Sequence, residues 1–217
     1  MIERYTRPEM GHLWSIQNEW QTILNVEIAA CEAMAELGEI PAAAVENIKA
    51  KAKFDVARIN EIEKTTDHDI IAFLTNLEEN VGEDSKYIHK GLTSSDVKDT
   101  AYCVMMRDAA AIILDDLQEF RTVLRRRANE FRHTPCIGRT HGIHAEPMTF
   151  GLKLLLWSAE IERDIERLEH GKKIVSVGKL SGAVGTYSNI NPRIEELTCK
   201  HLGLTPVRLA TQVIQRD

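Results

Sequence analysis

Glycine, proline and aromatic residues are scarce in this sequence. Its 217 residues include 12 glycines and 6 prolines, and aromatic side chains make up 6%. Long stretches contain neither glycine nor proline, and no segment shows the clear alternation of apolar and polar residues that is typical of half-buried strands. These absences argue against a β-sheet protein and predict an all-α fold.

The sequence also lacks long apolar runs, an apolar segment near its start and an excess of basic residues. Its apolar runs, such as the one at residues 154–157, are far shorter than the roughly 20 residues that span a bilayer. Residues 1–10 contain no apolar core of a secretory signal. The net charge of −6 has the wrong sign for general binding to nucleic acid. We therefore expect a cytoplasmic protein with neither a membrane nor a nucleic-acid partner.

Paired cysteines are missing as well. The four cysteines lie far apart and none forms a Cys-x-x-Cys pair, so the sequence suggests neither a zinc site nor a disulfide framework. Buried free thiols are typical of proteins in a reducing compartment. The cysteines are Cys31, Cys103, Cys136 and Cys199.

The sequence is rich in apolar residues at helical spacing. The most regular stripe covers residues 95–131, where apolar residues recur every three or four positions and charges fill the other face. A helix of this length is unusual in a globular domain and predicts a helical bundle. The predicted helices are 8–37, 42–54, 56–64, 69–81, 95–131, a long helix that begins at Pro147, and 191–202.

These helices predict two domains. Residues 1–92 form an N-terminal domain of short helices, and residues 93–217 form part of a central helical bundle. Two long antiparallel helices cannot bury both of their apolar stripes against each other. We therefore expect the remaining helices of the bundle to come from the rest of a longer protein or from other subunits.

The segment 138–151, Gly-Arg-Thr-His-Gly-Ile-His-Ala-Glu-Pro-Met-Thr-Phe-Gly, carries the densest chemistry in the chain. We expect residues 135–147 to form a loop that holds Thr140, His141 and His144 between rigid helices, where catalytic groups concentrate. Histidine suits general acid or base catalysis near neutral pH. A metal site would need a third ligand, and none is adjacent. The alternative is two histidines that are solvated or bonded to the backbone.

A polar turn precedes the helix predicted over residues 69–81. A carboxylate such as Asp69 can fix the tautomer of His68 and keep it protonated, which suits proton transfer. The alternative is simple capping of the helix by Asp67 or Asp69. His89, further along the chain, belongs either to the same site or to none.

The run Thr93-Ser94-Ser95-Asp96 opens the longest predicted helix. Hydroxyl and amide groups at a helix N-terminus bind carboxylate or phosphate, and a helix cap uses the same arrangement without a ligand. The glycine-rich segment 178–187 lacks both the Walker and the dinucleotide-binding patterns. We interpret its glycines as sites of close backbone approach or tight turns.

Taken together, these motifs resemble those of the adenylosuccinate lyases, a family of the fumarase/aspartase superfamily. The block 138–151 is the most specific of them, and the matching segments follow the order of the family along the whole chain. Fumarase and argininosuccinate lyase share the architecture but look less like this block. The matching segments are Arg4-Tyr5, Thr66–Asp69, Thr93–Asp96, Gly138–Gly151, Gly182–Tyr187 and Thr211-Gln212.

The resemblance implies a lyase of purine nucleotide biosynthesis that eliminates fumarate from adenylosuccinate, giving AMP, and from SAICAR, giving AICAR. A base removes a proton next to a succinyl carboxylate, and an acid protonates the departing nitrogen while the developing dianion is stabilised electrostatically. The resemblance implies His141 as the general acid, His68 as its partner, and neither a metal nor an organic cofactor. The substrate contacts that it implies are Arg4, Tyr5, Asp67, His68, Asp69, Thr93, Ser94 and Gln212, with His89 and Thr140 as further candidates.

The resemblance also implies a homotetramer with shared active sites, in which His68 and His141 of one site come from different chains. Two features depart from the pattern of the family. Position 67 is often basic in the family but is Asp67 here, which suits a backbone contact better than a side-chain contact to a substrate phosphate. The catalytic base of the family is a serine on a mobile loop followed by Met-Pro-x-Lys-x-Asn-Pro, and the sequence contains no such run. We therefore expect an N-terminal fragment that is inactive on its own.

Two other functions are compatible with the sequence. The first is another fumarate-releasing lyase of the superfamily, such as an argininosuccinate lyase, which a panel of substrates would distinguish. The second is a non-catalytic helical assembly module. It predicts that neither His68 nor His141 approaches a pocket in any oligomer.

Overall fold

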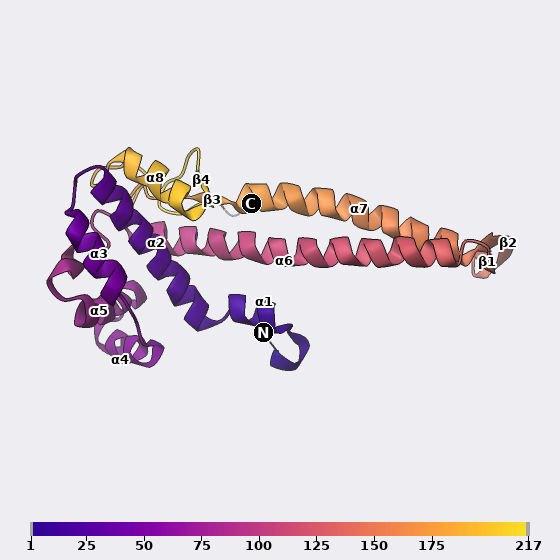
Figure 1. The fold of residues 1–217 in the computed structure, drawn as a ribbon, viewed down its shortest axis with the longest axis horizontal. Helices are drawn as coiled ribbons and strands as arrows, with labels where there is room; N and C mark the ends of the chain where they lie inside the picture. The colour runs from indigo at the N-terminus through magenta and orange to yellow at the C-terminus, as the bar shows by residue number, and fades with distance from the viewer. Residues whose placement is uncertain (1, 216–217) are drawn as a thin grey trace. The chain divides into compact units, whose positions relative to one another are not determined.

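The structure is a computed structural model that describes residues 2–215. Helices predominate and the strands are short, which confirms the all-α prediction (Figure 1). No helix among the described residues is both long and apolar enough to cross a membrane. The elements are η1 (Glu3–Tyr5), α1 (Pro8–Leu13), α2 (Ile16–Glu36), α3 (Ala42–Lys51), α4 (Val56–Thr66), α5 (Asp69–Val81), η2 (Gly82–Tyr87), α6 (Ser94–Glu130), β1 (Pro135–Thr140), β2 (Ile143–Thr149), α7 (Phe150–Val175), β3 (Val177–Gly178), α8 (Pro192–Leu202) and β4 (Thr205–Pro206).

The chain divides into two compact units. The first contains the residues up to Arg107 and those from Val175 onward, and the second contains Asp108–Ile174. Helix α6 contributes its beginning to the first unit and its remainder to the second. The predicted boundary between residues 92 and 93 separates an N-terminal domain from a helical bundle of which this chain contains only a part. It therefore stays a prediction.

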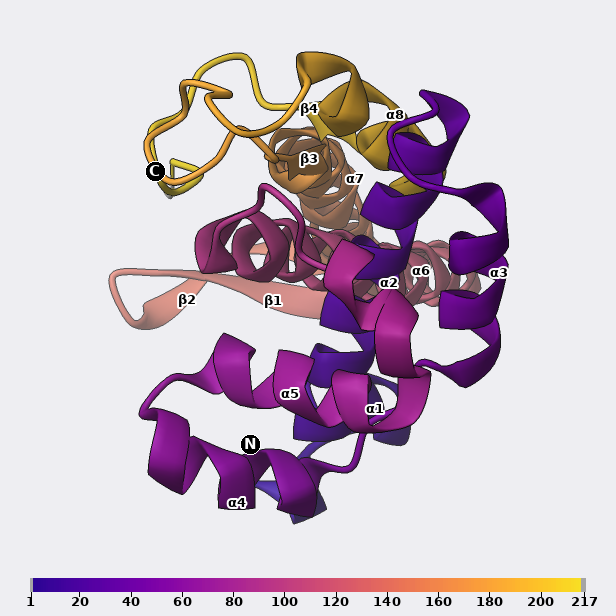
Figure 2. The ribbon, with the colours of Figure 1, turned by 90° about the vertical axis from the view of Figure 1, so that its left-hand side faces the viewer.

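The core of the first unit is built around α2. This helix packs against α3 and α8, and Trp20 on α2 stacks on Phe73 of α5 with ring centroids 4.9 Å apart. Val26, Ile48 and Ile70 are fully buried in the same apolar cluster. Helices α4 and α5 lie side by side in this unit (Figure 2).

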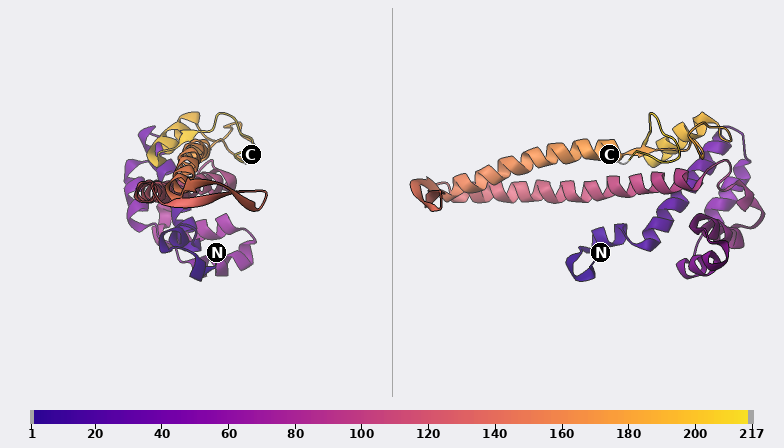
Figure 3. Two further views of the ribbon diagram at one scale, coloured as in Figure 1. Left: turned by 90° about the vertical axis from the view of Figure 1, so that its right-hand side faces the viewer. Right: turned by 180° about the vertical axis from the view of Figure 1, so that it is seen from behind.

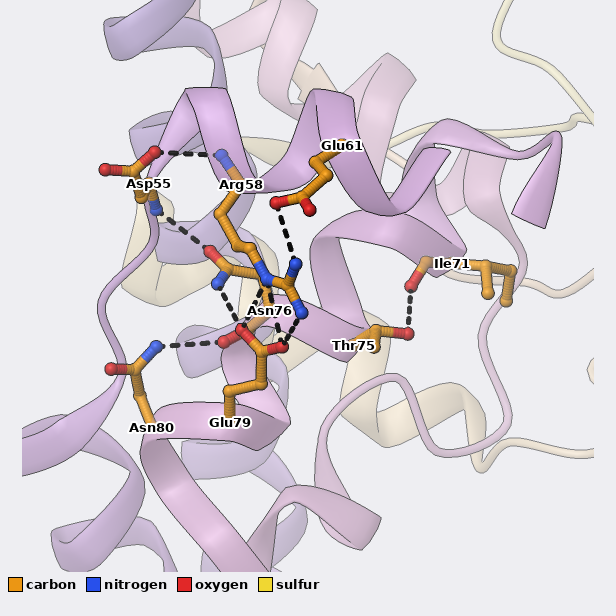
Figure 4. A network of polar contacts seen from close by, with 8 residues as sticks. All are labelled: Asp55, Arg58, Glu61, Ile71, Thr75, Asn76, Glu79 and Asn80. Atoms are coloured by element: carbon orange, nitrogen blue, oxygen red, sulfur yellow. Dashed lines mark hydrogen bonds and ion pairs between the residues drawn. The ribbon is translucent and has the colours of Figure 1, made fainter. Parts of the chain in front are cut away.

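A polar network joins α4 to α5. Asn76 is buried; its side chain accepts a hydrogen bond from Asp55 N at 2.9 Å and donates one to Glu79 at 3.0 Å. Arg58 of α4 forms an ion pair with the Glu79 carboxylate at 2.6 Å. Figure 4 shows these groups converging between the two helices. Specific polar contacts therefore stabilise the packing of α4 against α5 in addition to the apolar contacts.

Most predicted helices of the first unit are confirmed, with one break. The helix predicted over 69–81 has the bounds of α5, and Asn191 caps α8 by accepting a hydrogen bond from Arg193 N at 3.0 Å. The single helix predicted over 8–37 is wrong, because the chain breaks after α1. Ser15 is the N-cap of α2 and accepts a hydrogen bond from Asn18 N at 3.2 Å, which starts a new helix.

The second unit is a helical hairpin formed by the later part of α6 and by α7. Its small core consists of Leu124, Ala128 and Leu154, with Phe131 packed against it. A Cβ atom on Gly151 would lie 2.4 Å from Ala128 O, so only glycine allows the two helices to approach this closely. The strands β1 and β2 form the connection between the two helices (Figure 3).

The predicted loop over 135–147 is wrong, because this segment forms an antiparallel β-hairpin of β1 and β2 with a bulge after Ile137. The prediction that Pro147 begins the second long helix is also wrong. Pro147 pairs with Ile137 in the hairpin, where a two-stranded ribbon has only edge strands and tolerates proline. Helix α7 begins at Phe150 instead, and Thr149 Oγ1 accepts a hydrogen bond from Leu152 N at 3.2 Å.

Candidate active site

His141 lies at the tip of the β-hairpin. His141 and Gly142 connect the two strands with φ angles of +52° and +76°, and positive φ at both central residues is typical of a type I′ turn. Thr140, His141 and His144 are all exposed within the chain. The turn therefore presents the imidazole of His141 outward, where it is available to a ligand or to another chain.

The polar turn before α5 places His68 and Asp69 at a helix N-terminus. His68 is the N-cap residue, and its Nδ1 atom accepts a hydrogen bond from Ile71 N at 3.4 Å. Asp69 is the first residue of α5, and its Oδ1 accepts a hydrogen bond from Ile70 N at 2.7 Å. The N-cap is therefore His68 and neither Asp67 nor Asp69, so the alternative of capping by Asp67 or Asp69 is wrong. Asp67 is exposed, has a left-handed backbone (φ +48°) and ends α4 instead of capping α5.

The carboxylate of Asp69 contacts a lysine of α6. Lys98 Nζ forms a close ion pair with Asp69 Oδ2. Burial alone would raise the pKa of the Asp69 carboxyl group, but the hydrogen bonds from Lys98 and Ile70 N and the positive charge of Lys98 outweigh burial and lower it. Asp69 therefore stays ionised next to His68.

The structure brings two of the predicted site segments together. His68 Nε2 lies 3.4 Å from Ser94 Oγ at the start of α6, although the two residues are 26 positions apart in the sequence. Ser94 and the neighbouring Thr93 are half-buried, whereas His68 is exposed. An imidazole, a hydroxyl group and the N-terminus of a long helix thus face the same region, and this combination suits binding of a carboxylate and transfer of a proton.

His89 makes a separate, more buried contact. Its Nδ1 atom lies 2.6 Å from Glu27 Oε1, and its backbone N–H donates to Glu27 Oε2 at 2.9 Å. Burial would lower the pKa of the His89 imidazole, but the hydrogen bond and the charge of Glu27 raise it above the usual 6.5. Glu27, which orients His89, was not predicted from the sequence.

The remaining predicted contacts lie in the first unit, on exposed segments. The Arg4 guanidinium lies 4.7 Å from the centroid of the Tyr5 ring. Gln212 is exposed. Two residues before it, Ala210 packs closely against Gly185, since a Cβ atom on Gly185 would lie only 2.3 Å from Ala210 O. The segment that carries Gln212 therefore runs directly against the glycine-rich segment.

A buried ion pair next to Ser94 was not predicted from the sequence. Lys179 Nζ lies 2.6 Å from Asp96 Oδ1, and both side chains are fully buried. The only signal in the sequence was a lysine inside a glycine-rich segment, whose glycines we interpreted as sites of close backbone approach or tight turns. Among the described residues, no group of three His, Cys, Asp or Glu side chains is arranged to hold a metal ion.

The fold and the order of these motifs point to a single protein family. The chain belongs to the Lyase family, whose sequence profile matches residues 3–217. Over its whole length the chain is similar to proteins named adenylosuccinate lyase, with 54% identity to the one from Synechocystis sp. and 50% to the one from Bacillus subtilis. The chain spans about half the length of these curated relatives, corresponding to their N-terminal half.

Solved structures agree with this family. The chain is similar to a fumarate lyase from Mesorhizobium sp. BNC1, with a TM-score of 0.89 and 30% identity over 94% of this chain and 50% of that one. It is also similar to the 3-carboxy-cis,cis-muconate lactonizing enzyme from Pseudomonas putida, with a TM-score of 0.87 and 28% identity over 94% and 48% of the two chains. The helical architecture expected from the resemblance is therefore confirmed.

Proposed function

We propose that the complete polypeptide is an adenylosuccinate lyase, which cleaves adenylosuccinate to AMP and fumarate and SAICAR to AICAR and fumarate. The observation that supports this most strongly is the 50–54% identity to adenylosuccinate lyases along the entire chain. The contact between His68 and Ser94 adds a chemical argument, because it joins a proton-transfer group to a helix N-terminus suited to a carboxylate.

In the proposed reaction, His141 acts as the general acid and His68 as its partner. A base removes a proton from the succinyl carbon next to a carboxylate, the carbon–nitrogen bond breaks, and the departing nitrogen takes a proton from His141. Thr93 and Ser94 bind the succinyl carboxylate. Arg4 and Tyr5, which touch each other and are exposed, bind the nucleotide, with Arg4 on its phosphate. Further substrate contacts are Asp67, Asp69 and Gln212, with His89 and Thr140 as additional candidates.

We further propose a cytoplasmic homotetramer with active sites shared between subunits. The second unit supports this, because its small core leaves many large apolar side chains exposed on α6 and α7. Such a surface needs further helices to cover it. The four free thiols favour a reducing compartment. The exposed apolar side chains are Ile113, Phe120, Val123, Leu152, Leu155, Leu156 and Trp157.

The test is fumarate release by the complete, purified polypeptide. We expect release from adenylosuccinate and SAICAR and none from argininosuccinate. His141→Ala should lower kcat on the order of 10²-fold or more, as expected for a lost general acid. His170→Ala, an exposed histidine on α7, is the matched control and should keep wild-type kinetics. Absence of fumarate release, or equal effects of the two substitutions, would contradict the proposal.

A further inference from the structure

The pair of Asp96 and Lys179 is unusual because both charges are completely removed from solvent. Asp96 lies in the first turn of α6, Lys179 follows β3, and the two residues are 83 positions apart in the sequence. Burying an ion pair contributes little net stability, since the loss of hydration offsets most of the attraction. The presence of this pair therefore calls for a reason other than stability.

The remaining hydrogen bonds of the pair suggest such a reason. Asp96 Oδ2 accepts hydrogen bonds from two backbone amides, Thr93 N at 2.9 Å and Gly182 N at 3.1 Å. Lys179 Nζ donates a second bond to Gly182 O at 2.7 Å. The pair therefore bonds to both the N–H and the C=O group of Gly182. Since Asp96 also accepts from Thr93 N, the pair connects the Ser181–Gly182 turn to the Thr93–Ser94 turn.

The Thr93–Ser94 turn lies at the predicted site. Ser94 Oγ is 3.4 Å from His68 Nε2, so a shift of the Thr93–Ser94 turn would change the spacing between the predicted carboxylate ligand and the predicted proton-transfer group. Lys179 is fixed further by Thr100, whose hydroxyl group accepts from Lys179 N at 3.0 Å. A carboxylate is the side chain that can accept from two amides and an ammonium group at once.

We propose that Asp96 and Lys179 are positioning residues that hold the Thr93–Ser94 turn against the Ser181–Gly182 turn and thereby set Ser94 opposite His68. The expected effect of this positioning on kcat/KM rests on the proposed function. Neither residue touches the substrate. Asp96→Asn keeps the shape of the side chain but replaces one acceptor oxygen with a donor group that faces N–H donors, so it should release both turns.

The experiment compares three variants of the complete polypeptide. Asp96→Asn should lower kcat/KM for adenylosuccinate by about 10-fold or more, because small displacements of binding groups are costly in rate. The double variant Asp96→Asn with Lys179→Met has no unpaired buried charge, so it should fold and still show this loss. Asn76→Ala is the control, since Asn76 is a buried polar residue of the α4–α5 network (Figure 4) outside the predicted site. It should lose stability but keep wild-type kcat/KM.

Hydrogen–deuterium exchange provides a readout that does not depend on activity. Peptides that contain Thr93 and Gly182 should exchange faster in both Asp96 variants and at the wild-type rate in Asn76→Ala. Unchanged exchange in the double variant would overturn the proposal, and so would faster exchange with wild-type kcat/KM. If the wild-type polypeptide released no fumarate, the proposed function would fail, whereas the exchange rates would still decide whether the pair holds the two turns.

Discussion

Gly185 offers a sharp test of how closely the glycine-rich segment packs against the segment before Gln212. Its φ angle is +79°, and a Cβ atom there would lie 2.3 Å from Ala210 O and 3.0 Å from Thr211 Cα. Gly38 is the matched control, because its φ angle is +72° but a Cβ atom there would have no heavy atom of another segment within 4 Å. Alanine at Gly38 therefore meets only backbone strain, whereas alanine at Gly185 meets strain and a backbone clash.

The expected costs follow from these two geometries. A left-handed backbone costs an L-residue roughly 1–2 kcal/mol. Forcing an extra methyl group into a packed site adds roughly 1–3 kcal/mol. Gly38→Ala should thus lower the free energy of unfolding by about 1–2 kcal/mol and Gly185→Ala by about 2–5 kcal/mol. Urea titration followed by circular dichroism measures both, and equal losses in the two variants would refute the reasoning.

Two further predictions concern titratable groups. Burial raises the pKa of the Cys103 thiol to about 11, so near pH 8 its reactive thiolate should be roughly two to three orders of magnitude rarer than that of an ordinary cysteine. Iodoacetamide followed by mass spectrometry should label the less buried Cys136 first, and equal labelling would contradict this. The raised pKa of His89 means that its pairing with Glu27 stabilises the fold most below pH 6.5 and loses that effect as the pH rises through the raised value. The difference in free energy of unfolding between wild type and His89→Gln should therefore shrink with rising pH, and a constant or growing difference would speak against it.

Local signals in the sequence were sufficient for most helices. Helix α5 was predicted with its observed bounds. Helix α8 begins after the N-cap residue Asn191 and ends at Gly203, which has a left-handed backbone, and both are common signals of helix ends. The break before α2 was missed because the apolar spacing continues across it, although Ser15 is a good N-cap. In that case the capping signal was stronger than the periodicity.

The hairpin was missed for a different reason. Its strands are largely exposed, and apolar and polar residues alternate only over residues 143–146, so the usual signal of a strand is weak. The pair His141-Gly142 was the available clue, because two residues with positive φ connect antiparallel strands. The placement of His141 at an exposed tip followed only from the structure.

The sequence alone determined the helical character of the chain, most of its helix ends and the residues that resemble a lyase site. These features depend on neighbours within a few positions along the chain. The tertiary structure decided that His68 faces Ser94, that Glu27 orients His89 and that Lys179 is buried against Asp96. Such contacts join residues 26 to 83 positions apart, and they form only when packing of the core brings distant helices and turns together.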